Sequence, residues 1–311
     1  MSLYGDMMFI ESSVHMEEAA DIIAVMQLQE STIYRRNDYL SVPKYAKVVD
    51  GTWRQRIVEW MFGVVDHCSL RRDSVAVAVY YLDLCVEKGV IESRQEFQLA
   101  AMTALQLAIK LYDSTVVKLD SMIKLGRGLF TEQDVIDMET KMLKALKWQV
   151  HPPTPICFLR QFLRLLPPVV APLARYVVAE VTRFISEISV CLYKFVDCPS
   201  SAVAYAGMLI AMEKIDEAAL SICQRQQIFQ TMSIAVKLDH QSPQVVEIIE
   251  RLKSSLEKNV SLQDLMNTIN AQCQAEGYCK LASSNAISDH FGKTRATSLH
   301  SPRDVVSARR A

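Results

Sequence analysis

The chain has 311 residues, of which 50% are hydrophobic and 22% charged, enough for one large or two medium domains with apolar cores. Its formal net charge of −1 lacks the basic excess typical of nucleic-acid binding, and we find neither a signal peptide nor a run of about 20 apolar residues. We therefore expect a soluble intracellular protein that binds neither nucleic acid nor membranes. Only 9 glycines are present and no proline occurs between Pro43 and Pro152, which predicts an all-α fold.

The most apolar stretch, residues 97–112 (FQLAAMTALQLAIKLY), predicts a buried helix at the centre of a helical bundle. It contains no Gly or Pro and a single charge, Lys110, and it lacks the polar face that a surface helix shows every 3.6 residues. Its sixteen residues are too few, and Gln98 and Gln106 too polar, for a membrane span. We expect other helices to surround it on all sides.

Five helices are expected in this first half, preceded by a weakly amphipathic segment over residues 16–39. The first helix has an apolar stripe at helical spacing, formed by Trp53, Ile57, Trp60, Met61, Val64 and Val65. The second covers residues 74–87 with Asp73 as its cap. The third is the apolar stretch at residues 97–112, and a short fourth covers about 116–125.

Thr131 and Asp134 form a capping-box-like start for the fifth helix, which we expect to end near Trp148. Its predicted inward residues are Val135, Met138, Met142 and Leu146.

Residues 151–155 (HPPTP) form a stiff linker, because three prolines remove amide donors and restrict their neighbours. Thr154 can cap a new helix that begins with Pro155, and Ser242 followed by Pro243 marks another helix start. The five segments expected after the linker cover residues 155–166, 171–196, 200–214, 218–238 and 243–258. Five helices on each side of a Pro-rich linker suggest a duplicated bundle.

The last part of the chain is expected to be a short helix over residues 261–273 and then a disordered tail, since the remainder is Ser-rich and lacks apolar periodicity. Residues 280–311 carry six Lys or Arg against two Asp, so the tail is basic. Ser301 precedes Pro302 and Arg303 and is a candidate site for a proline-directed kinase. A tail without regulation is an equal alternative.

No pattern typical of an active site, metal site or cofactor site is found. The eight cysteines form no CxxC pair and the six histidines no HExxH motif, so we expect reduced core thiols and no metal. Gly-rich phosphate loops and nucleophile elbows are also missing. The sequence predicts a non-catalytic protein without a cofactor.

Several motifs of the first half resemble the cyclin family. WRQRIVEW at 53–60 is similar to the family's MRxILxxW motif, and LAIK at 107–110 matches LAxK. The segments MET at 138–140, LKALKW at 143–148 and TPICFL at 154–159 are similar to the run ME...L..L.W...PTP..FL. The motifs cover about residues 30–165, and the second half resembles the family by its helix layout.

The resemblance implies two tandem five-helix cyclin-box bundles with an N-terminal helix and a disordered C-terminal tail. The expected divisions are 1–50 for the N-terminal helix and extension, 51–152 for the N-terminal cyclin box, 153–260 for the C-terminal cyclin fold, and 261–311 for the short helix and tail.

The resemblance also implies a regulatory subunit that binds a cyclin-dependent kinase and activates it by repositioning the kinase αC helix and activation loop. It places kinase contacts at Lys110 and Glu139, with Leu111 and Tyr112 extending the surface. From the residues alone, another interpretation is open: Lys110 extends into water at a helix C-terminus, and Glu139 is solvated or bonds Lys110 internally.

A second implied surface is the family's groove for substrates and inhibitors that carry an Arg-x-Leu motif. By position it would use Trp53, Arg54, Ile57, Trp60, Phe97 and Gln98. Here Trp53 replaces Met, Arg56 replaces Ile, and Gly63 replaces the acidic residue that receives the ligand's Arg. We therefore expect weak or altered docking of acidic or larger apolar peptides. Alternatively, Trp60 and to a lesser extent Trp53 are core residues.

The family reading favours cell-cycle control, in the nucleus and cytoplasm. The only Arg-x-x-Leu core, Arg160–Leu163, falls inside a predicted helix, which fits a G1/S role better than a mitotic one. A partner of a transcriptional kinase is the main alternative. A TFIIB-like initiation factor shares the duplicated bundle, but its DNA binding would need a basic surface.

Overall fold

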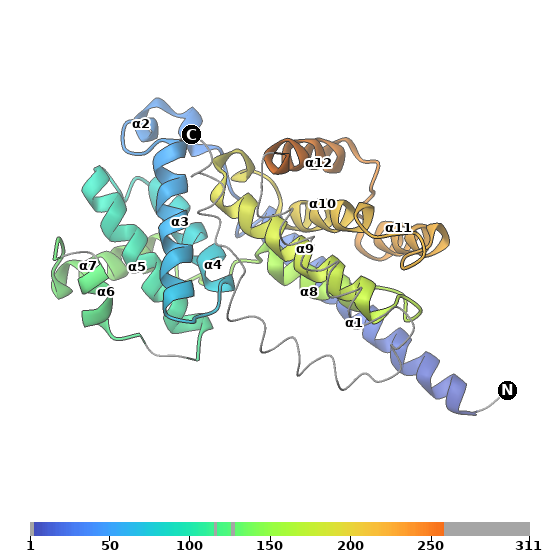
Figure 1. Ribbon diagram of the computed structural model, residues 1–311. Helices are drawn as coiled ribbons and strands as arrows, with labels where there is room; N and C mark the ends of the chain where they lie inside the picture. Colours follow the sequence, from blue (N-terminus) through green and yellow to red (C-terminus); the bar gives the residue numbers. More distant parts are fainter. Residues whose placement is uncertain (1–2, 115–116, 126–127, 258–311) are drawn as a thin grey trace. The chain divides into compact units, whose positions relative to one another are not determined.

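The computed structural model describes residues 3–114, 117–125 and 128–257, and all regular structure within them is helical (Figure 1). This confirms the predicted all-α class. The α-helices are α1 (Leu3–Ser31), α2 (Pro43–Ala46), α3 (Gly51–His67), α4 (Asp73–Glu87), α5 (Arg94–Tyr112), α6 (Leu119–Leu125), α7 (Glu132–Ala145), α8 (Pro155–Arg164), α9 (Pro172–Cys191), α10 (Ser200–Glu213), α11 (Ile222–Val236) and α12 (Pro243–Leu256). Two short 3-10 helices are η1 (Tyr39–Ser41) and η2 (Tyr193–Phe195).

The chain divides into two compact units, each of which combines separate segments of sequence. The first unit consists of residues 28–154 and 187–199. The second contains residues up to 27, residues 155–186, and the chain from residue 200 onward. Helices α1 and α9 therefore each contribute residues to both units.

Helix α5 is the centre of the first unit, as its composition predicts. It contacts α3, α4, α6 and α7, and every residue from 100 to 109 is buried. The Ser93 side chain caps the helix by accepting a hydrogen bond from the amide of Glu96 (3.1 Å). The helix reaches the surface at its two ends, at Arg94 and Gln95 in the first turn and at Lys110 and Leu111 in the last.

The sequence predicted the start of α7 correctly but placed its end too far along the chain. The capping box of Thr131 and Asp134 is present, and the four residues predicted to face inward are buried. The helix ends at Ala145, three residues before Trp148, because Lys147 and Trp148 adopt positive φ angles of 50° and 62° that an α-helix does not contain.

Two helix starts in the first unit differ from the prediction. Asp73 is the first residue of α4 and not its cap; Arg72 is at the cap position, and the Asp73 carboxylate accepts a hydrogen bond from the Arg71 guanidinium (3.0 Å). Helix α6 begins at Leu119, three residues after the predicted start.

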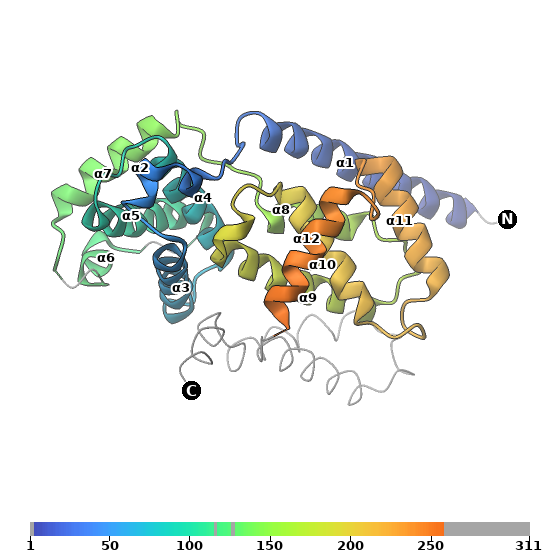
Figure 2. The ribbon, with the colours of Figure 1, turned by 90° about the horizontal axis from the view of Figure 1, so that it is seen from above.

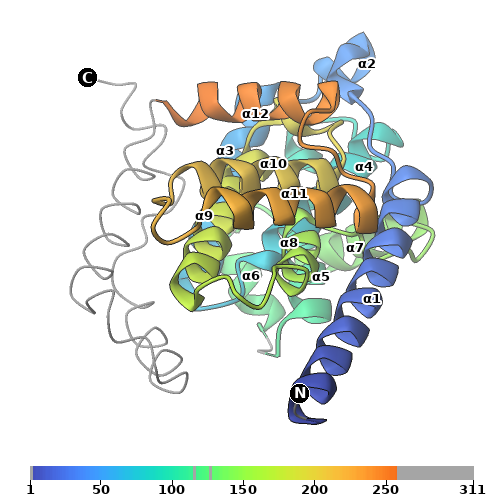
Figure 3. The same ribbon diagram turned by 90° about the vertical axis from the view of Figure 1, so that its right-hand side faces the viewer.

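The second unit is built around α10, which packs between α8 and α12 (Figure 3). All residues from 200 to 212 are buried. Gly207 permits this close packing: a Cβ atom at this position would lie 3.2 Å from a methyl carbon of Thr182 and 3.4 Å from one of Ile185. Helices α5 and α10 thus have the same role in their respective units.

The described part of α1 covers the second unit beside α11 (Figure 2). Glu18 pairs with Arg164 at 2.5 Å, and the Gln27 side chain donates to the carbonyl of Val236 (3.0 Å). The helix ends at Ser31, eight residues before the predicted limit at Tyr39. The extension that follows is tethered by side-chain contacts in the first unit.

An arginine in the first turn of a helix binds the carbonyl groups at the end of the preceding helix, and this occurs twice in the second unit. Arg175 in α9 donates to the carbonyls of Leu163, Leu166, Pro167 and Val170, around the end of α8. Arg225 in α11 donates to those of Met212, Ile215 and Leu220, around the end of α10. Each guanidinium adds hydrogen bonds to carbonyls at and just beyond a helix end, and two of these carbonyls, those of Pro167 and Met212, also accept a backbone amide.

The starts of α8 and α12 are as predicted, with Ser242 capping α12. The predicted helix at 261–273, the tail and Ser301 lie outside the described residues.

Candidate partner-binding site

Lys110 and Glu139 lie together at the surface of the first unit. Lys110 belongs to the last turn of α5 and Glu139 to the middle of α7, and the ammonium lies 2.7 Å from a carboxylate oxygen. Their side chains are 48% and 24% exposed. The internal ion pair that the sequence left open as an alternative therefore exists, in a position that a partner protein can reach.

An exposed ion pair of this kind contributes at most about 1 kcal/mol to stability, because water and salt screen both charges. Replacing this bond with bonds to a partner consequently costs little. The pair offers one donor group and one acceptor group that point outward from neighbouring helices.

The two residues that follow Lys110 differ in their solvent exposure. Leu111 is exposed, as expected for a contact residue. Tyr112 is half-buried, and its hydroxyl donates to the carbonyl of Val150 (3.0 Å) and lies 2.9 Å from Nδ1 of His151. Tyr112 therefore holds the end of α5 against the segment that follows α7.

The structure adds Trp148, the last residue of the LKALKW motif, as an exposed residue near this pair. The indole is 71% exposed, and the backbone amide of Trp148 donates to the carbonyl of Leu143, one turn beyond Glu139 (3.1 Å). Ile136, one turn before Glu139, is also exposed. Exposed aromatic and aliphatic groups around a charged pair are typical of protein interfaces. The signal available in the sequence was a Trp immediately after a charged residue at the end of an amphipathic helix.

The predicted peptide-docking groove is only partly at the surface, and two of its residues are corrected. Trp53, Ile57, Trp60 and Gln98 are half-buried. Arg54 is 2% exposed and Phe97 fully buried, so neither side chain lines an open groove. Arg54 faces inward because it lies four residues before Val58 and seven before Met61, on the buried face of α3.

Arg54 instead forms a buried ion pair with Asp83 of α4. Its Nε and a terminal nitrogen each lie 2.8 Å from a different carboxylate oxygen, and the other terminal nitrogen donates to the carbonyls of Val190 and Cys191. Burial acts to lower the pKa of Arg54, but the charge of Asp83 and the hydrogen bonds to it outweigh burial, and the pKa is raised. Asp83, the one charge in the middle of an apolar helix, was a signal for such pairing that sequence reasoning missed.

Asp83 also fastens the N-terminal extension. The Tyr39 hydroxyl donates to it (2.8 Å), and the Tyr193 hydroxyl from η2 donates to Asp38 (2.6 Å) while accepting from the amide of Leu40 (2.7 Å). Burial raises the pKa of both phenols, which keeps them protonated as donors. The extension, α4 and residues 187–199 are therefore one hydrogen-bonded assembly.

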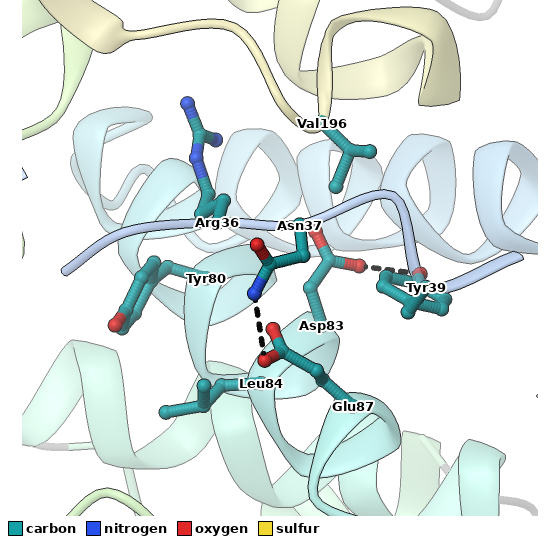
Figure 4. A pocket seen from close by; sticks show the side chains of 8 residues that line it. All are labelled: Arg36, Asn37, Tyr39, Tyr80, Asp83, Leu84, Glu87 and Val196. Carbon is teal, nitrogen blue, oxygen red and sulfur yellow. Dashed lines mark hydrogen bonds between the residues drawn. The ribbon is translucent and has the colours of Figure 1, made fainter. Parts of the chain in front are cut away.

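A small cavity lies where the extension crosses α4 (Figure 4). Asn37 reaches across it to donate to Glu87 (3.0 Å), beside the bond from Tyr39 to Asp83. Its volume is about 10 Å³, room for a single water molecule and far below that of a small-molecule site. The cavity belongs to the packing of the extension.

The described residues contain no group of three or more His, Cys, Asp or Glu side chains placed to hold a metal ion. In the same residues, none of the helices combines the length and apolar composition needed to cross a membrane.

The fold and the outward-facing charged pair define a two-unit helical protein with a surface suited to binding another protein. Two family models match nearly the whole described chain: the cyclin N-terminal domain over residues 21–151 and the cyclin C-terminal domain over residues 153–285. The chain therefore belongs to the cyclin family.

Relatives of known identity include Cyclin-A1-1 of Arabidopsis thaliana, 27% identical over 61% of this chain and 41% of that protein. G2/mitotic-specific cyclin-2 of Medicago sativa is 27% identical over 62% of this chain and 59% of that protein. The crystal structure of a viral cyclin from herpesvirus saimiri has the same fold, with a TM-score of 0.56 and 15% identity over 75% of this chain and 95% of the viral one. This chain thus matches about half the length of the plant relatives.

Proposed function

We propose that this protein binds a cyclin-dependent Ser/Thr protein kinase through its first unit and activates it in control of the cell cycle. The observation that carries the proposal is the exposed Lys110–Glu139 pair, together with the exposed apolar residues Leu111, which follows Lys110, and Trp148, whose amide bonds the carbonyl of Leu143 one turn beyond Glu139. The chain contributes no catalytic group. Its role is to bind the kinase αC helix, bring that helix's Glu to the catalytic Lys and release the activation loop, as phosphoryl transfer requires.

The energetics of the pair suit this role. The ion pair between Lys110 and Glu139 is weak while water surrounds it, but both charges become buried when a partner covers them. Removing one partner of a buried interfacial charge costs about 2 to 5 kcal/mol, and each 1.4 kcal/mol changes affinity tenfold. We therefore expect Lys110→Ala and Glu139→Ala to weaken kinase binding at least about tenfold.

The test is a titration of each variant with purified cyclin-dependent kinases, after recovery of the partner from dividing cells. Lys141→Ala, an exposed lysine two residues after Glu139, is the matched control and should bind normally. The exchange variant Lys110→Glu with Glu139→Lys keeps an internal ion pair but reverses the charges offered to the kinase, so it should fold and fail to bind. Wild-type affinity in the folded variants would refute the site.

We also propose a peptide-docking groove without the buried residues Arg54 and Phe97. Its accessible residues are Trp53, Ile57, Trp60 and Gln98. The exposed cation of Arg56 and the absence of an acidic side chain at Gly63 oppose a basic ligand. We expect an ordinary Arg-x-Leu peptide to bind only weakly. Low-micromolar binding of that peptide in fluorescence polarisation would contradict the expectation.

The kinase recovered from cells distinguishes a cell-cycle role from a transcriptional one. A salt-dependent shift of DNA in a gel would instead support the TFIIB-like alternative. We propose localisation in both nucleus and cytoplasm, and imaging of the tagged protein tests it. The G1/S expectation is tested by protein abundance in synchronised cells, with a peak in G2 or mitosis as the contrary result.

A further inference from the structure

The turn that follows α7 has a strained backbone. Lys147 and Trp148 both have positive φ angles, of 50° and 62°, a region that residues other than glycine rarely occupy. Three amides of this turn donate to carbonyls at the end of α7 (3.0 to 3.1 Å): Lys147 to Lys144, Trp148 to Leu143 and Gln149 to Leu146. The pattern is similar to a Schellman helix end, where glycine is the usual residue at the positive φ. Because neither residue here is glycine, we expect further contacts to hold the turn.

Two tyrosine hydroxyls supply such contacts immediately after the strained residues. The carbonyl of Val150 accepts a hydrogen bond from Tyr81 of α4 (2.5 Å) and another from Tyr112 at the end of α5 (3.0 Å). Tyr81 is fully buried, and burial raises the pKa of its hydroxyl, which therefore stays protonated as a donor. The two donors come from different helices of the first unit and bind the same backbone atom, so they fix the position of that atom relative to both helices.

The carbonyl of Val150 connects the two parts of the candidate partner-binding site. Tyr112 follows Lys110 by two residues, and Val150 follows Trp148 by two residues. The two hydrogen bonds to Val150 therefore tie the end of α5, which carries the Lys110 ammonium, to the turn that carries the exposed indole.

An exposed aromatic side chain binds a partner more strongly when its backbone is already fixed, because less conformational freedom is lost on binding. The turn after α7 would otherwise leave its strained conformation easily, since positive φ is unfavourable for Lys147 and Trp148. If only a fraction of the molecules had the turn in place, the apparent affinity for a partner would fall by that fraction. The hydroxyl contacts to Val150 oppose this loss.

We propose that Tyr81 and Tyr112 are positioning residues for Trp148. By holding the carbonyl of Val150, they fix the strained turn in the conformation that presents the indole to a partner protein. Tyr81 acts only through the turn, because its side chain is buried, whereas Tyr112 is half-buried and close to Lys110. Substitution of Tyr81 is therefore the clearer test. Its effect on kinase affinity rests on the proposed function, but its effect on the turn does not.

Hydrogen–deuterium exchange of the full chain measures how firmly the turn is held. Tyr81→Phe removes one hydroxyl and keeps the buried ring, so the unit should stay folded while the amides of residues 147–149 exchange about three- to tenfold faster. Tyr80→Phe is the matched control on the same helix, because the Tyr80 ring packs against Tyr34, and it should leave these amides unchanged. Adding Lys147→Gly to Tyr81→Phe should slow the exchange again, because glycine adopts a positive φ without strain.

Binding gives a second, independent measurement. Tyr81→Phe should weaken the affinity for the kinase recovered from dividing cells about three- to tenfold. In the Trp148→Ala background, where no indole is presented, the same change should have no further effect, whereas a general loss of stability would weaken binding in both backgrounds.

Wild-type exchange of the turn in Tyr81→Phe would overturn the proposal, and so would equal losses of affinity with and without the indole. If the wild type bound no kinase, the proposed function would fail, while the exchange rates would still decide whether Tyr81 holds the turn.

Discussion

The buried ion pair between Arg54 and Asp83 allows a quantitative test of the first unit. Arg54→Met removes two charge-assisted hydrogen bonds from Asp83 and two donors from the carbonyls of Val190 and Cys191. Asp83 then stays buried with the Tyr39 hydroxyl as its remaining donor among these contacts. Removing one partner of a buried pair costs about 3 to 5 kcal/mol, a large part of the 5 to 15 kcal/mol that stabilises a typical domain.

Urea unfolding followed by tryptophan fluorescence is the appropriate assay, since all three tryptophans (Trp53, Trp60 and Trp148) belong to the first unit. With a slope of about 2 kcal/mol per molar urea, the midpoint should fall by about 1.5 to 2.5 M. Arg56→Met, two residues away on the exposed side of α3, is the control and should change the free energy of unfolding by less than about 0.5 kcal/mol.

The double variant Arg54→Met, Asp83→Leu adds a second criterion. Because no unpaired charge remains, it should recover part of the stability that Arg54→Met loses, although the Tyr39 hydroxyl then lacks its acceptor. A loss below about 1 kcal/mol in Arg54→Met, or a double variant less stable than the single one, would refute the reasoning.

Three further outcomes are expected. Arg225→Met removes the guanidinium donors from the carbonyls of Met212, Ile215 and Leu220. It should destabilise the second unit by about 2 to 3 kcal/mol, measured by near-ultraviolet circular dichroism, unlike the exposed control Lys214→Met. Gly207→Leu forces a side chain into the contact between α10 and α9 and should cost about 1 to 3 kcal/mol in the same assay. Burial raises the pKa of the Cys85 thiol to about 12, so almost no reactive thiolate is present there at pH 7.5. Iodoacetamide should therefore label the exposed Cys223 and spare Cys85 in the folded protein. Equal labelling of the two cysteines would show that α4 opens.

Much of the helical layout was predictable because its causes are local. The uninterrupted apolar stretch around residues 100–109 predicted the central helix of the first unit, and the structure buries each of those residues. Ser242 before Pro243 and the capping box at Thr131 marked helix starts, since a cap involves residues only three positions apart. The end of α7 was predicted too far along the chain because the apolar spacing typical of a helix continues to Trp148. The positive φ angles of Lys147 and Trp148, which end the helix, leave no mark in that spacing.

At the candidate site, the contacts and the solvent exposure of the residues could not be predicted from the sequence. The sequence identified Lys110 and Glu139 as charges in unusual surroundings, but only the folded chain decided that they bond to each other across two helices. It also decided that Trp148 lies in water, because exposure depends on which neighbours cover a residue and not on its own apolar character.

The sequence by itself determined the helices, their caps, the central helix of the first unit and the family motifs, because these depend on residues within a few turns of one another. The tertiary structure decided that Arg54 is an interior charge and not part of a groove, and that residues 187–199 belong to the first unit. The partners of Arg54 lie 29 to 137 positions away along the chain, and no local pattern specifies contacts at such separations. Long-range pairing of buried polar groups is therefore what the fold alone contributes.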